Sequence, residues 1–250
     1  MALFYLYAFF LGGCIGSFVN VVALRTANDT SFLRGRSHCP KCGATLRGVD
    51  LIPVLSYLFL RGRCHACHAR ISPRYPVTEL VSGGLFMLCL WQYGLSLEAL
   101  NACILASLLL CVFLTDLDTL TIPNGLVLCF LVPAALDVWL TGGADIWGRI
   151  IGIFAISLPM FLLTLLIPDC FGGGDIKLMA VCGFLLGWRA ALMAAFFAIV
   201  SCGLFALILL LTKRAKRGDH IAFGPWLAVG IFAAKLFYLP IMTAYLTLFV

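Results

Sequence analysis

Three acids stand beside long apolar runs, where they could do chemistry. Asp116 and Asp118 end one run in LTDLDTLTIPNGL, and Asp175 follows three glycines in FGGGDIKL. Ionisable residues in such places are costly and usually functional. Two carboxylates that share a low-dielectric site cannot both ionise easily, so one keeps a proton while the other acts as a base. Such a pair can activate a water and protonate a leaving amine, which is aspartic protease chemistry.

The residues around Asp175 could admit a substrate. Glycines leave room for an extended backbone and permit positive φ, and a lysine places a positive charge nearby. The residues expected to meet a substrate are Gly172, Gly173, Gly174 and Lys177. Two alternatives stay open: Asp175 could be only a helix N-cap, or a channel or transporter could use the acids as ion ligands. Asp118 competes with Asp116, because positions two apart on a helix point in different directions.

Four cysteines form two CxxC pairs in the long polar stretch 25–76. The pairs are CPKC and CHAC, with 21 residues between them, and the four thiols are Cys39, Cys42, Cys64 and Cys67. Two such turns predict a tetrahedral structural zinc site with no position left open for water. Disulfides are the rival interpretation, which a reducing cytoplasm disfavours.

Apolar helices must position these groups. The chain of 250 residues is 63% hydrophobic and 11% charged, which is typical of an integral membrane protein. Helices satisfy their own backbone in lipid, so we expect an all-α polytopic membrane protein, with about eight transmembrane helices and a cytoplasmic zinc-binding insert between the first two. The helices are expected near 2–24, 78–94, 97–115, 122–140, 147–167, 176–187, 190–212 and 222–249. The sixth is short, so it should begin inside the protein or be sheltered from lipid by its neighbours.

Basic residues set the predicted orientation. Nine of the 17 lysines and arginines lie between Arg25 and Arg74, and four more lie in 213–217, so both loops should be cytoplasmic. Asp116 and Asp175 then end at the same, cytoplasmic face. Nucleic-acid binding is not expected, because the bases cluster on juxtamembrane loops. The predicted domains are a first transmembrane helix at 1–24, the zinc-binding insert at 25–77, associated with methyl transfer, and a transmembrane aspartyl peptidase domain at 78–250.

The sequence resembles the type IV prepilin peptidases, the prepilin leader peptidase/N-methyltransferases among the GxGD intramembrane aspartyl proteases. The blocks that carry the resemblance, besides the double CxxC, are GSFVNVVALR, IPVLSYLFLRGRC, ISPRYPVTEL, DLDTLTIPN, GGGDIKLMA and FGPWLAVG. The resemblance implies that Asp116 and Asp175 are the catalytic pair. It implies an enzyme of the bacterial inner membrane that cleaves the basic leader of prepilins or pseudopilins at the cytoplasmic surface and N-methylates the new terminus from S-adenosylmethionine.

No Gly-rich dinucleotide loop follows a strand in this sequence, so the methyl-donor site must be built from membrane helices and the insert. The candidates from the matching blocks are Asn20, Arg74 and Glu79, whose alternative roles are loop anchoring and helix capping. The chain departs from the family pattern at Leu51 and Ala222, away from both aspartates. A peptidase without methyltransferase activity therefore remains an alternative.

Overall fold

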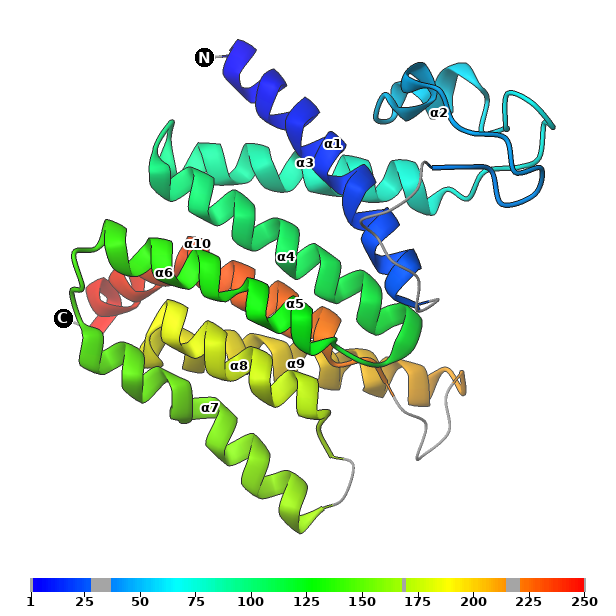
Figure 1. The fold of residues 1–250 in the computed structure, drawn as a ribbon. Coiled ribbons are helices and arrows are strands. Elements are labelled where there is room, and N and C mark those ends of the chain that lie inside the picture. The colour runs from blue at the N-terminus through cyan, green and yellow to red at the C-terminus, as the bar shows by residue number, and fades with distance from the viewer. Residues whose placement is uncertain (1, 28–36, 168–169, 215–220, 250) are drawn as a thin grey trace. The chain divides into compact units, whose positions relative to one another are not determined.

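The computed structural model describes residues 2–27, 37–167, 170–214 and 221–249 (Figure 1). These residues form helices, with two isolated bridges outside them, and the predicted all-α class is confirmed. The chain divides into two compact units, 1–99 and 100–250. The domain boundaries predicted at 24 and 77 separate segments of different expected function. The division into compact units does not test them, so they stay a prediction.

Unit 1 consists of two long helices and the insert between them. Helix α1 spans Ala2–Ala27 and α3 spans Arg74–Tyr93, while the insert holds the short 3-10 helix η1, Gly48–Leu51, and α2, Leu55–Phe59. Small residues let α1 and α3 approach closely: a Cβ on Gly12 would lie 2.7 Å from the Ser82 carbonyl oxygen, and one on Gly16 would lie 2.9 Å from the Thr78 carbonyl oxygen. This is the packing that membrane helices use when small residues line the contact.

The other helices belong to unit 2, apart from the first turn of α4. Their bounds are α4 Leu97–Thr119, α5 Asn124–Cys129, α6 Leu131–Leu140, α7 Ile146–Leu166, α8 Gly173–Leu186, α9 Trp188–Leu211 and α10 Gly224–Phe249. The predicted helix at 122–140 is in fact two, which meet at Phe130. The predicted helix at 176–187 begins earlier, so that Gly173 and Gly174 belong to its first turn.

Five described helices are long and apolar enough to cross a membrane, namely α1, α4, α7, α9 and α10. The chain is therefore a membrane protein. The α5–α6 pair and α8 are shorter, and α3 does not reach the same hydropathy. The predicted count of about eight spans stays a prediction.

Helix α8 lies at the centre of unit 2 and contacts α5, α6, α7, α9 and α10 (Figure 1). Its Leu178, Met179 and Cys182 side chains are fully buried in the core. A Cβ on Gly183 or on Gly152 of α7 would overlap the backbone of the other helix, so glycine is required at both positions. The short helix is thus sheltered by its neighbours, as its length predicts.

A buried charge cluster joins the far end of α8 to four other helices. The Asp137 carboxylate accepts hydrogen bonds from Arg149 Nη2 at 2.6 Å, from Asn101 Nδ2 at 3.3 Å and from the Lys235 ammonium. Arg149 also donates from Nη1 to the Leu185 carbonyl oxygen of α8 at 2.9 Å. Asp137 is only 7% exposed, because α6, α7 and α10 enclose it. Hydropathy alone predicts that this acid lies at the membrane interface, and this prediction is wrong because Asp137 is buried among its partners.

Candidate active site

Asp116 lies in the last turn of α4 and is 4% exposed. Its Oδ2 accepts a hydrogen bond of 2.8 Å from the backbone N–H of Gly224, the first residue of α10. The N-terminus of a helix favours a negative charge, so this contact suits an ionised carboxylate. A Cβ at Gly224 would lie 2.8 Å from the same oxygen, which explains the glycine. Asp118, in contrast, is exposed.

Asp175 is also buried, at 7% exposure, and occupies the first turn of α8. The N-cap of α8 is Gly172 and not Asp175, and the Asp175 backbone N–H donates to the Gly172 carbonyl oxygen at 3.1 Å. The second carboxylate oxygen, Oδ1, is buried and has no hydrogen-bond partner among the described residues. The charge of Asp116 acts on Asp175, so the two carboxylates lie within electrostatic reach of each other.

The three glycines before Asp175 have different surroundings. Gly172 and Gly173 are exposed, and a Cβ on Gly173 would meet no atom within 4 Å. A Cβ on Gly174 would lie 2.8 Å from Ile122 Cβ and 3.1 Å from the Ile122 carbonyl oxygen. None of the three adopts positive φ, so the conformational role expected for them is wrong. Gly172 and Gly173 leave their backbone exposed, and Gly174 allows close contact between α8 and Ile122.

Two further contacts join the segments that carry the acids. Lys177 Nζ donates to Asn124 Oδ1 at 2.8 Å, which ties the first turn of α8 to the start of α5. The rings of Phe171 and Phe223 lie 5.5 Å apart and tie the glycine segment to the start of α10. Sequence reasoning missed Asn124 and Gly224. The signal available for both was a turn dipeptide, Pro-Asn or Gly-Pro, directly at the start of an apolar run.

The four cysteines of the insert in unit 1 come together. Their sulfurs all lie within 4.8 Å of one another, and Cys39 Sγ is 3.9 Å from Cys67 Sγ. A tetrahedral zinc with Zn–S bonds of about 2.3 Å would separate sulfurs by about 3.8 Å, which fits this cluster. The backbone N–H groups of Cys42 and Lys41 hydrogen-bond the sulfur and lower the pKa of Cys39 to about 6. The thiols are not joined as disulfides, so the cluster could hold a metal ion.

The residues considered for a methyl donor lie along α1 and α3 of unit 1. Asn20 is fully buried, and neither its amide nitrogen nor its amide oxygen has a partner among the described residues. Glu79 is 7% exposed and accepts a hydrogen bond of 2.7 Å from the Val54 backbone N–H. Arg74 begins α3. Val54 is a β-branched residue at φ 62°, a strained conformation that the Glu79 contact helps to hold.

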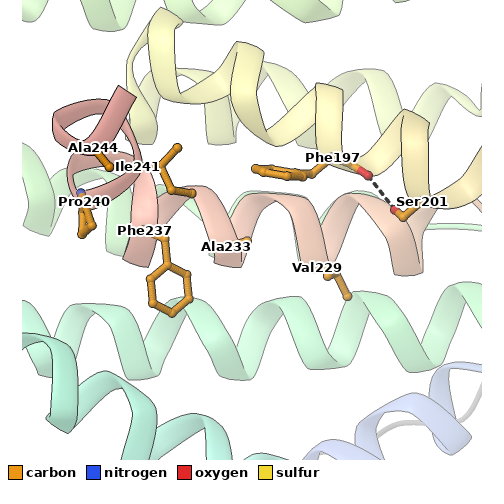
Figure 2. A pocket seen from close by; sticks show the side chains of 8 residues that line it. All are labelled: Phe197, Ser201, Val229, Ala233, Phe237, Pro240, Ile241 and Ala244. Atoms are coloured by element: carbon orange, nitrogen blue, oxygen red, sulfur yellow. Dashed lines mark hydrogen bonds between the residues drawn. The ribbon is translucent and has the colours of Figure 1, made fainter. Parts of the chain in front are cut away.

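An apolar groove of about 500 Å³ runs between α9 and α10 in unit 2 (Figure 2). Phe197, Ala233 and Phe237 line it, and Pro240 lies at its end. The hydroxyl group among the lining side chains belongs to Ser201, and it donates to the Phe197 carbonyl oxygen of the same helix at 2.6 Å. The groove therefore offers no free polar group to orient a polar cofactor.

The described residues form a multi-helix membrane protein with two buried acids in one unit and a four-thiol cluster in the other. Family comparison identifies its class. Residues 10–93 match the bacterial peptidase A24 N-terminal domain and residues 103–207 match the type IV leader peptidase family. The chain belongs to the type IV leader peptidase family, and it is an enzyme of the protease and methyltransferase type found there.

Three relatives, each named prepilin leader peptidase/N-methyltransferase, illustrate the match. The Bacillus subtilis protein is 36% identical over 95% of this chain and 96% of its own length. The Myxococcus xanthus protein is 37% identical over 85% of this chain and 65% of its own. The Neisseria gonorrhoeae protein is 34% identical over 88% of this chain and 85% of its own length. No solved structure matches the chain.

Proposed function

We propose that the chain cleaves the leader peptide of prepilins or pseudopilins, with Asp116 and Asp175 as the catalytic pair. The observation that carries this proposal is the buried Oδ1 of Asp175, which lacks a partner among the described residues while its carboxylate lies within electrostatic reach of Asp116. A buried, unsatisfied carboxylate oxygen is costly. A bound water or a substrate carbonyl at this position would satisfy it.

The two acids divide the work of peptide hydrolysis. They share one proton, so one carboxylate takes a proton from the attacking water while the other donates to the leaving amine. The Gly224 N–H fixes the orientation of Asp116, and the contact between Gly174 and Ile122 fixes the position of the segment that carries Asp175. The exposed backbone at Gly173 leaves room for an extended substrate beside the pair.

The names of the three relatives, each a prepilin leader peptidase/N-methyltransferase, support a prepilin or pseudopilin as the substrate. A short basic leader would approach the acids from the cytoplasmic face of the bacterial inner membrane, while the apolar segment of the pilin stays in the lipid bilayer. The distribution of basic residues supports this orientation and a multi-pass topology. No nucleic acid takes part.

The test is incubation of the purified chain with a prepilin peptide and S-adenosylmethionine, followed by mass measurement of both fragments. Asp116→Asn and Asp175→Asn should each lower cleavage by about 10²- to 10⁴-fold, because each removes one proton-transfer group. Asp118→Asn is the matched control, since this exposed acid lies two positions from Asp116. Normal cleavage by either of the first two variants would contradict the assignment.

We further propose that the chain N-methylates the new amino terminus from S-adenosylmethionine, and that Asn20, Arg74 and Glu79 hold this donor. The donor would supply an electrophilic methyl group on a sulfonium. The residues fit such a ligand, because the Asn20 amide is buried without a partner and Glu79 places a carboxylate close to the α1–α3 contact. Asn20→Ala should leave cleavage intact while the product is one methyl group lighter. If wild-type product carries no methyl group, the enzyme is a peptidase alone.

The metal of the cysteine cluster is proposed to be a single structural zinc. Four thiolates complete its shell, so it would hold the two turns of the insert together and would take no part in peptide hydrolysis.

A further inference from the structure

The insert of unit 1 carries a basic pocket that the proposed function does not use. The pocket has a volume of about 590 Å³. Its lining includes Tyr57, Arg61, Arg63, Arg70 and Ser72. The three arginines are exposed, and in the part of the chain that the structure describes no acid forms an ion pair with them. The pocket therefore offers guanidinium, phenol and hydroxyl donors to a ligand and supplies no carboxylate of its own.

The two CxxC turns of the insert share one backbone structure, so the residues that they carry can be compared position by position. Cys39 N–H donates to the Ala44 carbonyl oxygen at 2.9 Å, and Cys64 N–H donates to the Ala69 carbonyl oxygen at 2.9 Å. A bridge closes each turn: His38 pairs with Thr45 in the first, and Arg63 with Arg70 in the second. The turn forms with His38 and Thr45 as well, so its backbone structure does not require the arginine pair.

The arginine pair is unfavourable without an anion. Arg63 and Arg70 face each other across an antiparallel bridge, and like charges in this arrangement repel. Asp50 is the only acid among residues 37–73, and its Oδ2 lies 3.1 Å from His65 Nδ1 and accepts from the Arg47 backbone N–H at 2.9 Å. An anion in the pocket would relieve the repulsion. Arginine is the residue best suited to bind phosphate in a bidentate manner.

The surroundings of the pocket indicate which anion it takes. Tyr57 packs over Gly62, where a Cβ would lie 2.9 Å from the phenol oxygen. Tyr57 belongs to α2, whose next two residues, Leu58 and Phe59, are 63% and 83% exposed. Apolar side chains beside a basic cluster are the pattern of a segment that lies in the interface of an anionic membrane. The basic leader and the sulfonium of S-adenosylmethionine are both cations, so the pocket would repel them.

We propose that this pocket binds the phosphate of an anionic phospholipid, with the arginines on the phosphate and Leu58 and Phe59 among the acyl chains. The pocket thereby fixes the insert on the membrane surface. The binding is independent of peptide cleavage and of methyl transfer.

The test uses the full chain in neutral detergent, titrated with phosphatidylglycerol and followed by native mass spectrometry. Arg63→Gln combined with Arg70→Gln should weaken the tightest phosphatidylglycerol site roughly 25-fold, since each arginine near an anionic headgroup contributes a factor of roughly five. Lys41→Gln combined with Arg47→Gln removes the same charge from the same insert outside the pocket, and should change this affinity by less than about twofold. Retained metal in both variants shows that the insert is folded.

The other outcomes are decisive as well. Arg63→Lys combined with Arg70→Lys keeps the charge and loses the planar fork, so it should weaken binding less than the glutamine variant. Equal losses in the pocket and control variants would mean that general surface charge is responsible and would overturn the proposal. Competition by inorganic phosphate at the same concentration as phosphatidylglycerol, or equal binding of phosphatidylcholine, would also overturn it.

Discussion

Replacement of Asp137 by leucine should destabilise the protein strongly. The Asp137 carboxylate accepts from Arg149, Lys235 and Asn101 inside unit 2, and its side chain is 10% exposed. Without it, two cations face each other in a buried site. Removal of one partner from a buried ion pair costs about 3–5 kcal/mol. At about 1.4 kcal/mol for each factor of ten, the folding equilibrium should fall by about 100- to 4,000-fold.

The measurement is reversible unfolding in mixed micelles, followed by circular dichroism. A triple variant, Asp137→Leu with Arg149→Met and Lys235→Met, replaces the whole cluster by apolar side chains and should recover most of the loss, because well-packed apolar groups can substitute for a buried ion pair. The matched control is Glu98→Leu, which removes an exposed acid from the first turn of α4 and should cost no more than about 1 kcal/mol.

Two results would refute the reasoning. A cost below about 1 kcal/mol for Asp137→Leu would mean that the carboxylate is solvated or neutral, as an exposed pair would be. A triple variant less stable than the single one would mean that other contacts of the two cations, such as the bond from Arg149 to the Leu185 carbonyl oxygen, stabilise the fold more than their pairing with the acid does.

Three other predictions concern the site and the insert. Gly174→Ala should reduce cleavage by about 10- to 100-fold, because its Cβ would lie 2.8 Å from Ile122 Cβ and shift the segment that carries the acid; unchanged kinetics would show that the segment yields freely. Lys177→Met and Asn124→Ala each break the same hydrogen bond, so the two variants should reduce cleavage by factors similar to each other. The double variant should then cleave only slightly more slowly than either single variant, and additive losses would argue against the contact. Purified protein should contain one zinc per chain, measured by metal analysis, and Cys64→Ser should release it; retention would show that the ion is bound elsewhere.

Much of this structure could be predicted from hydropathy and spacing. The expected ends of the helices lie within a few residues of α1, α7, α9 and α10, because apolar length is a property of the local sequence. The spacing of the four thiols also predicts that they lie together. Each CxxC pair forms its own turn, and a shared metal needs all four sulfurs. The burial of Asp116 and Asp175 also agrees with their places at the ends of apolar runs.

The contacts between distant polar atoms could not be predicted. Gly224 meets Asp116 across 108 positions, and Lys177 meets Asn124 across 53, and neither separation leaves a periodic signal in the sequence. The break at Phe130 was missed because the apolar run continues from α5 through Phe130 into α6. Hydropathy records how much of a segment avoids water. It does not record which polar atoms meet once water has been removed.

The two ends of α8 have a consequence for how so short a helix survives in a bilayer. At one end the Arg149 guanidinium binds two of the last carbonyl groups, and at the other the first turn carries the Asp175 carboxylate, where a helix favours negative charge. A charged side chain of the protein thus stands at each terminus, so the helix does not need to cross the whole bilayer. The end that carries the proposed catalytic Asp175 can then be set at whatever depth the surrounding helices dictate, so the thickness of the host bilayer need not govern where this carboxylate lies.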